Sequence, residues 1–273
     1  MSVAAAGTGV GRIGNAFATA RAERRVAIAV YLTVGFPDRA ATGGLLRAAL
    51  DGGADLLELG VPFSDPVADG VTVQRASEVA LRGATGLQDC LDATRELRRE
   101  RDACVLLMGY TNPFLRYGLA RFARAAEEAG VSGVIVPDLP AEEGDEIDRE
   151  LIPRGVARVD LYAPTTPDDR LDLLLPRSRG FAYCVSLTGV TGARAALPAD
   201  VAAFVARVRR RTALPVAVGF GISLPEHVAA LRGIADGVAV GSAAIDAVAN
   251  AAPDTRERAL RDFVASLAAA ARW

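Results

Sequence analysis

Short apolar runs rich in β-branched residues alternate along this chain with longer segments in which apolar and polar residues recur at helical spacing. Eight of the short runs have the length and composition of buried strands. They cover residues 26–33, 54–60, 104–108, 133–137, 157–162, 181–185, 215–219 and 237–240. Continuously apolar strands of this kind are typical of parallel sheets that are covered by helices.

The longer segments predict amphipathic helices between these strands. They cover residues 40–51, 87–101, 120–129, 141–151, 167–175, 199–211 and 225–231, with 256–271 closing the chain. The connection between the second and third strands is longer than the others, and we predict an extra helix in it at residues 73–81. Eight strand and helix units without a linker-like segment predict an α/β fold, a single-domain (β/α)8 TIM barrel over residues 1–273.

The composition limits the classes of protein to which this chain can belong. Its 273 residues, 51% of them hydrophobic, match the roughly 250 residues that such a barrel takes. A formal net charge of −2 gives no electrostatic footprint for nucleic acid. No apolar run reaches the about 18 residues needed to cross a bilayer, so we predict a cytoplasmic protein without nucleic-acid or membrane partners.

Missing residue types restrict the chemistry further. The three cysteines lack C-x-x-C spacing, which favours neither a disulfide framework nor a zinc site. All 31 basic residues are arginines, so no lysine is present to form a Schiff base, and His227 is the only histidine. We predict His227 on the surface, away from the acids described next. Any catalysis must therefore rely on carboxylates and hydrogen-bond donors, with no metal.

Two acids stand at the end of the second predicted strand and behind it. Glu58 interrupts the apolar run 54–59, where an acid is costly unless it is paired, hydrogen-bonded or facing a cavity. Asp69 follows eleven positions later, beyond a loop stiffened by two prolines. Both acids also have structural interpretations: Glu58 bonded to the hydroxyl of Tyr183 or Tyr110, and Asp69 capping the next helix.

In a barrel, the loops after the carboxyl ends of the strands build the active site. The last loops place glycines where backbone N–H groups must approach a ligand, and Ser242 can begin a helix with a partly positive N-terminus. Gly221, Gly241 and Ser242 therefore predict a phosphate site, the alternative being ordinary turn and cap chemistry. Gly189 and Gly192 fit the same site, or a loop that closes without touching the ligand.

Other polar residues at these strand ends have less specific interpretations. Asp65 is predicted as a turn or interface residue, while Asn112 and Asp138 fit either turn chemistry or contact with a partner. The G-x-G-x-x-G sequence at residues 9–14 follows no strand and lies in no βαβ unit, so we interpret it as a coincidence of composition.

With these residues in place, the chain resembles the α subunits of tryptophan synthase over nearly its whole length. The resemblance is carried by residues 57–66 and 68–70, Tyr110 with 112–113, 137–140, Tyr183 with Ser186, 189–192, 219–223 and 241–242. It implies cleavage of indole-3-glycerol phosphate to indole and D-glyceraldehyde 3-phosphate without a cofactor. The carbon–carbon bond to indole C3 breaks readily once C3 is protonated, and a base then takes the proton of the neighbouring hydroxyl.

The resemblance also assigns roles residue by residue. It implies that Glu58 is the general acid and base, with a pKa raised by its apolar strand, and that Asp69 accepts the indole N–H and stabilises positive charge on the ring. The implied substrate-binding residues are Tyr183 and Phe220 beside the indole, Tyr110, and Thr191, which would hold Asp69. The implied phosphate ligands are backbone groups of Gly192, Gly221, Gly241 and Ser242.

A partner is implied in the same way. Members of this family work with a pyridoxal-phosphate-dependent β subunit in an α2β2 complex, and the implied contact residues are Pro62, Phe63, Asp65, Asn112 and Asp138. Val71 stands where the family usually has proline, so we expect a looser loop there. Three alternatives stay open: a stand-alone lyase that releases indole, a non-catalytic regulatory subunit that binds a phosphorylated ligand, and another phosphosugar isomerase.

Overall fold

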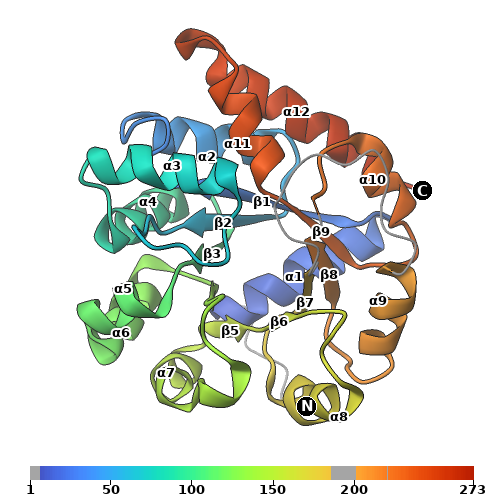
Figure 1. Cartoon of the computed structure of the whole chain (residues 1–273). Helices are drawn as coiled ribbons and strands as arrows, with labels where there is room; N and C mark the ends of the chain where they lie inside the picture. The colour runs from blue at the N-terminus through green and yellow to red at the C-terminus, as the bar shows by residue number, and fades with distance from the viewer. Residues whose placement is uncertain (1–6, 186–200, 220) are drawn as a thin grey trace.

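The predicted strands pair side by side in one parallel sheet that curves into a nearly closed barrel (Figure 1). The computed structural model describes residues 7–185, 201–219 and 221–273. The strands are β1 (Ala27–Thr33), β2 (Leu56–Gly60), β3 (Cys104–Met108), β4 (Gly133–Ile135), β5 (Ala157–Val159), β6 (Leu161–Tyr162), β7 (Ala182–Val185), β8 (Val216–Gly219) and β9 (Gly237–Val240). Their order in the sheet is β5-β4-β3-β2-β1-β9-β8-β7-β6, which confirms the predicted α/β barrel.

The fifth predicted strand, 157–162, is divided into β5 and β6 at Asp160. Its carboxylate is buried, accepts a hydrogen bond from Ser178 Oγ at 2.9 Å and forms an ion pair with Arg158. Arg158 is in turn held by Asp148 at 2.7 Å. Buried charges of this kind need such partners. The two ends of the sheet are therefore joined by the chain itself and by this ionic network.

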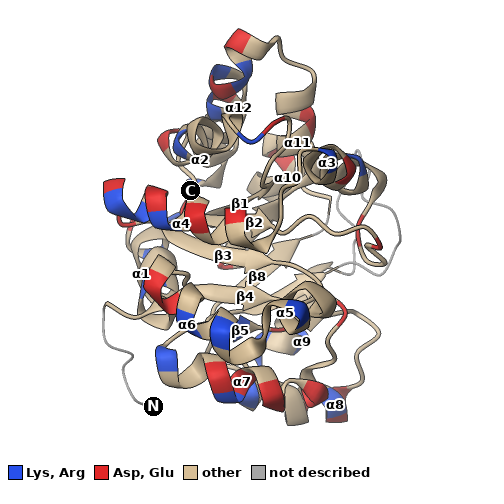
Figure 2. Ribbon diagram, turned by 90° about the vertical axis from the view of Figure 1, so that its left-hand side faces the viewer, with Lys and Arg blue, Asp and Glu red and all other residues tan. Residues whose placement is uncertain are grey.

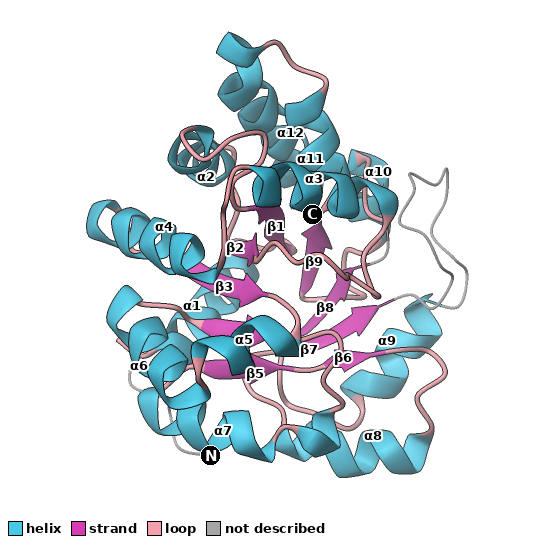
Figure 3. Cartoon of the chain, turned by 60° about the vertical axis from the view of Figure 1, so that its left-hand side comes forward, coloured by secondary structure: helices cyan, strands magenta, loops and turns pink. Residues whose placement is uncertain are grey.

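Helices surround the barrel, as the sequence predicts (Figure 3). Those at predicted positions are α2 (Ala41–Asp51), α3 (Val71–Arg82), α4 (Leu87–Glu100), α6 (Leu119–Ala129), α8 (Asp168–Leu174), α9 (Val201–Arg209), α10 (Pro225–Ala230), α11 (Ser242–Ala249) and α12 (Arg256–Ala271). The predicted helix 141–151 is instead the 3-10 turn η1 (Ala141–Glu143) followed by α7 (Asp145–Leu151). The break falls at Gly144, where a Cβ atom would lie 2.4 Å from the Arg158 guanidinium carbon.

The structure adds elements that the sequence analysis missed: α1 (Gly9–Ala22), α5 (Thr111–Tyr117) and the 3-10 turns η2 (Ile152–Arg154), η3 (Leu175–Arg177) and η4 (Pro253–Thr255). The glycine-rich segment 9–14 is the first part of α1. Gly9 packs so closely that a Cβ atom would lie 2.6 Å from the Ser132 carbonyl oxygen. Ile13 and Phe17 enter the inner core beside the starts of several strands. This helix therefore closes the N-terminal end of the barrel.

Two apolar clusters follow from the alternation of side chains along the strands. Leu57 and Leu59 belong to the outer cluster between strands and helices, whereas Leu56 belongs to the inner cluster. Charged side chains lie mostly on the surrounding helices and loops, where both signs are interspersed (Figure 2). Among the described helices, none is both long and apolar enough to span a membrane. With its N-terminal end closed, the barrel has its open face at the carboxyl ends of the strands.

Candidate active site

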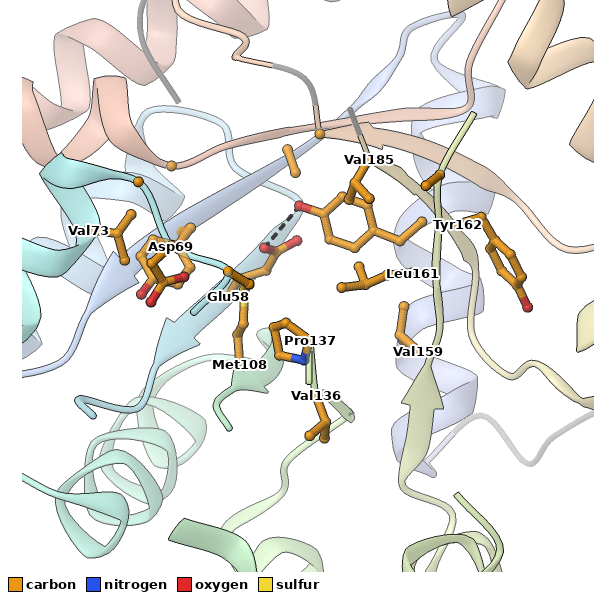
Figure 4. Close-up of a pocket in the computed structure, with 18 of the residues that line it drawn as sticks. Glu58, Asp69, Val73, Met108, Val136, Pro137, Val159, Leu161, Tyr162 and Val185 are labelled. Carbon is orange, nitrogen blue, oxygen red and sulfur yellow. Dashed lines mark hydrogen bonds between the residues drawn. The ribbon is translucent and has the colours of Figure 1, made fainter. Parts of the chain in front are cut away.

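A cavity of about 920 Å³ lies at the carboxyl ends of the strands and brings most of the predicted site residues together. Its wall includes Glu58, Asp69, Tyr183, Gly221, Gly241 and Ser242. Figure 4 shows Glu58, Asp69 and apolar side chains from neighbouring strands around this space. Carboxyl groups and an apolar wall in one concave site fit a ligand with an aromatic part.

Glu58 lies in the middle of β2, in register with Tyr31 on β1 and Leu106 on β3. Because Leu57 and Leu59 face the helices, Glu58 points into the barrel, where it is 1% exposed. Tyr183 Oη donates a hydrogen bond to its Oε2 at 3.4 Å, whereas Oε1 has no partner among the described residues. The hydrogen bond to Tyr183 that the structural interpretation of Glu58 expects is therefore present, but it leaves one carboxyl oxygen free for chemistry.

Burial raises the pKa of Glu58 to about 7, and the hydrogen bond from Tyr183 opposes this only in part. The charged form is disfavoured because its desolvation is not balanced by a nearby cation. A carboxyl group with this pKa holds a proton in a large fraction of molecules near neutral pH. Glu58 can therefore act as an acid and, after losing its proton, as a base.

We expect Glu58→Gln to stabilise the fold at alkaline pH. Folding raises the pKa of Glu58 from 4.5 to about 7, so the protonated acid is the form that folding favours. The contribution of this group to the free energy of unfolding is greatest below pH 4.5 and falls by about 3 kcal/mol as the pH rises through 7. Glutamine has no proton to lose, so urea unfolding should show the variant about 3 kcal/mol more stable at about pH 9.

The comparison with wild type at about pH 3.5 is the control, because the side chain at position 58 is then neutral in most folded and most unfolded molecules of both proteins. The two free energies of unfolding should nearly coincide there. Equal stability of the two proteins at both pH values would contradict the raised pKa.

Asp69 ends the loop between β2 and α3. Gly70 is the N-cap residue of α3 and no side chain caps this helix, so the capping interpretation of Asp69 is wrong. The Asp69 carbonyl oxygen accepts a hydrogen bond from Gln74 Nε2 at 2.8 Å, which leaves the carboxyl group beside the cavity. Burial raises its pKa to about 6, and a hydrogen bond with Tyr110 opposes the rise. Above pH 6 the charged form of Asp69 predominates.

Two tyrosines position these acids. Tyr183 lines the cavity and contacts Glu58. Its ring fits beside β8 because residue 219 is a glycine, where a Cβ atom would lie 2.5 Å from the ring. Tyr110 is not among the residues that line the cavity. Its hydroxyl accepts a hydrogen bond from the Ala68 N–H at 3.0 Å, and its ring stacks on Phe63. Tyr110 therefore holds the loop that carries Asp69.

The predicted phosphate residues lie at the ends of β8 and β9. Gly221 has a φ of +52°, which favours glycine, and Gly241 is the N-cap residue of α11. Ser242 is the first residue of that helix, and its Oγ is buried without a partner among the described residues. Free N–H groups at a helix N-terminus and a buried hydroxyl are suited to an anion. The predicted residues Thr191, Gly192 and Phe220 lie outside the described residues.

The surface prediction for His227 is wrong. The residue is 4% exposed and lines the same cavity, on the short helix α10. Proline and glutamate before it suggest an exposed helix start, but α10 packs against α12 and turns the imidazole inward. Ser223, to which the sequence analysis gave no role of its own, also lines the cavity, and its backbone N–H contacts His227. The sequence did hold a signal for this placement: the histidine lies near the start of a helix that directly follows a glycine-rich strand end.

The residues predicted to contact a partner lie on the loops after β2, β3 and β4. Pro62 is buried and Phe63 half-buried, whereas Asp65, Asn112 and Asp138 are exposed. The Asp138 carboxylate accepts hydrogen bonds from the N–H and Oγ1 of Thr111, at 2.9 and 3.0 Å. Val67 in the first of these loops is 84% exposed, and Val71 at the start of α3 is 62% exposed, so both add apolar surface on this side.

Comparisons with known proteins agree with this arrangement. A family model described as "Tryptophan synthase alpha chain" matches residues 17–271. The tryptophan synthase alpha chain of Chloroflexus aurantiacus is 46% identical over 260 residues, which are 95% of this chain and 98% of that one. That of a Roseiflexus species is 48% identical over 257 residues, 94% of this chain and 98% of the relative.

Solved structures give the same result. Tryptophan synthase from Mycobacterium tuberculosis superposes with a TM-score of 0.90 at 37% identity, and the match covers 96% of this chain and 98% of that chain. The tryptophan synthase alpha chain of Legionella pneumophila superposes with a TM-score of 0.87 at 35% identity, over 95% and 96% of the two chains. Both the sequence and the barrel are therefore similar to those of tryptophan synthase alpha chains.

Proposed function

The chain belongs to the family of tryptophan synthase alpha chains, and we propose that its barrel cleaves indole-3-glycerol phosphate to indole and D-glyceraldehyde 3-phosphate. The observation that carries this proposal is the pair of carboxyl groups, Glu58 and Asp69, on the wall of one cavity. Burial raises the pKa of both acids, to about 7 and about 6. Their environments are suited to opposite tasks near neutral pH, one acid protonated and the other ionised.

In the first step, protonated Glu58 gives its proton to C3 of the indole, and the ring becomes a cation. The Asp69 carboxylate accepts the indole N–H and stabilises this charge. The bond between C3 and the glycerol carbon then breaks, and its electron pair restores the aromatic ring. Ionised Glu58 takes the proton of the hydroxyl group on that carbon, which becomes the aldehyde. Glu58 thereby regains the proton that it gave, so no co-reactant is consumed.

The phosphate group occupies the other end of the site in this proposal. In this proposal, backbone N–H groups at Gly221, Gly241 and the start of α11 donate hydrogen bonds to the phosphate, so no lysine is required. Tyr183 stays beside the indole and donates its hydrogen bond to Glu58. The proposal includes the remaining predicted ligands because of the motif alone. They are Thr191, Gly192 and Phe220.

We also propose that a pyridoxal-phosphate-dependent β subunit docks on the loops after β2, β3 and β4 in an α2β2 complex. The predicted contacts are Pro62, Phe63, Asp65, Asn112 and Asp138. Exposed Val67 supports an interface at the first loop, since an apolar side chain gains most from being covered. Phe63 stacks on Tyr110, which holds the loop that carries Asp69, so docking there can act on the site.

The decisive experiment measures indole formation from indole-3-glycerol phosphate by wild type, Glu58→Gln and Asp69→Asn, each with and without a tryptophan synthase β subunit. The proposal expects cleavage by wild type that the β subunit accelerates, and strong losses in both variants. Fast cleavage without a β subunit favours the stand-alone lyase. Full activity of Glu58→Gln favours the regulatory subunit, and an inactive wild type in both conditions overturns the assignment.

A separate prediction concerns Asp138. Asp138→Ala removes the acceptor for the Thr111 N–H at the start of α5, and loss of such a cap costs about 1 kcal/mol. We expect urea unfolding to show this loss, and titration with β subunit to show weaker stimulation of cleavage. The exposed Asp254 in η4 provides a control, since Asp254→Ala should change neither quantity. Unchanged stimulation in Asp138→Ala would argue against this interface.

A further inference from the structure

The imidazole of His227 has one nitrogen bonded and one without a partner. Nδ1 accepts a hydrogen bond from the backbone N–H of Ser223 at 3.3 Å. A nitrogen that accepts a bond carries no proton, so the proton of the neutral ring is on Nε2. Nε2 is buried and has no hydrogen-bond partner among the described residues. The bond to Ser223 therefore makes Nε2 a donor of fixed direction.

Two hydroxyl groups at the same end of the cavity share this condition. Ser223 Oγ and Ser242 Oγ are both buried without a partner among the described residues, and both residues line the cavity with His227. Each buried polar group left without a partner costs about 1 to 3 kcal/mol. Ser223 follows β8 and Ser242 follows the neighbouring strand β9, so one ligand group with several acceptor oxygens could accept hydrogen bonds from all three. A phosphate monoester is such a group.

The cationic side chains of the cavity wall are already engaged. Arg158 is paired with Asp148 and Asp160, and Arg170 with Glu142 at 2.7 Å. Among the described residues of the wall, donors for an anion at this end must therefore come from backbone N–H groups, hydroxyl groups and the imidazole. His227 supplies the imidazole of this set, and a neutral donor binds a phosphate without an opposing charge to desolvate.

We infer that His227 is a phosphate-binding residue, which donates a hydrogen bond from Nε2 to a phosphoryl oxygen of the substrate together with the hydroxyl groups of Ser223 and Ser242. The inference rests on the proposed function for the identity of the substrate, but not for the presence of a phosphate site. The competing interpretation is that the bond from Ser223 to Nδ1 only fixes the start of α10.

Nuclear magnetic resonance of the full chain tests the contact directly, because the chain has a single histidine and its ¹⁵N signals need no assignment. The probes are inorganic phosphate and glycerol 3-phosphate, with binding measured in parallel by calorimetry. We expect saturable shifts of the Nε2 and Hε2 signals, with Nδ1 nearly unchanged. Binding without a shift at Nε2, or no binding of either probe, overturns the inference.

Two variants separate phosphate binding from a role in fixing the helix. The amide of Gln in His227→Gln reaches the position of Nε2, whereas that of Asn in His227→Asn reaches only the position of Nδ1. We expect His227→Asn to weaken glycerol 3-phosphate binding and to raise KM for indole-3-glycerol phosphate about tenfold, with a much smaller change in kcat. His227→Gln should restore most of both. Retained affinity in His227→Asn with a lower Tm in His227→Gln overturns the inference.

The outcomes of the phosphate-binding measurements are independent of the proposed reaction. If wild type binds phosphate at Nε2 but does not cleave indole-3-glycerol phosphate with a β subunit, the proposed function fails and the inference holds. If cleavage occurs while Nε2 is unchanged on phosphate binding, the inference fails and the function holds.

Discussion

Glu58→Gln should lower kcat for cleavage of indole-3-glycerol phosphate by about a thousandfold. Glutamine keeps the size of the side chain and can still accept the hydrogen bond from Tyr183. It can neither give a proton to C3 nor take one from the substrate hydroxyl group. Both proton transfers therefore lose their catalyst, while binding of the substrate is largely kept. Indole formation in the presence of saturating β subunit measures the effect.

Tyr183→Phe is the matched control for this change. It removes the donor to Glu58 Oε2 but leaves the carboxyl group, so a much smaller loss of kcat is expected. A rate for Glu58→Gln within tenfold of wild type would show that another group transfers the proton.

Asp69→Asn should lower kcat by about a hundredfold. Asparagine keeps an oxygen for the indole N–H but lacks the negative charge that opposes the cation on the ring. In wild type, activity should fall as the pH drops below about 6, where Asp69 gains a proton, and fall again above about 7, where Glu58 loses one. The acidic limb of the pH–rate profile should be missing in Asp69→Asn.

The profile of the variant decides the role of Asp69. Loss of rate with an unchanged acidic limb would mean that a different group titrates there. Glycerol 3-phosphate should bind the variant as it binds wild type, because the phosphate end of the cavity is formed by β8, β9 and their helices.

Most of the barrel could be predicted because its strands and helices depend on the local pattern of apolar and polar residues. Apolar runs at regular intervals define the strands, and a lone acid inside such a run, Glu58, marks the site. The division at Asp160 was missed because its partners, Arg158 apart, come from remote segments such as Ser178. Helix α5 was missed for a similar reason: Thr-Asn-Pro resembles a turn, and the carboxylate that caps it belongs to Asp138, 27 positions away.

Only part of the site could be predicted, because the placement of the other residues depends on contacts with remote segments. Residues in motifs, such as Glu58, Asp69 and Ser242, were placed at the cavity as expected. His227 was misplaced because burial of a polar side chain on a short helix depends on what packs over it. Tyr110 was expected against the substrate, but side-chain direction at a strand end cannot be predicted from the motif. Thr191, Gly192 and Phe220 stay predictions.

The buried carboxyl group of Glu58 also has an evolutionary consequence. Its raised pKa means that the ionised acid weakens the fold, so selection for stability alone favours replacement by a neutral residue. Only selection for catalytic turnover opposes such a replacement. In a lineage whose cells take up tryptophan and no longer need this activity, we therefore expect substitutions at position 58 first. Substitutions of the apolar residues of the same strand should follow later.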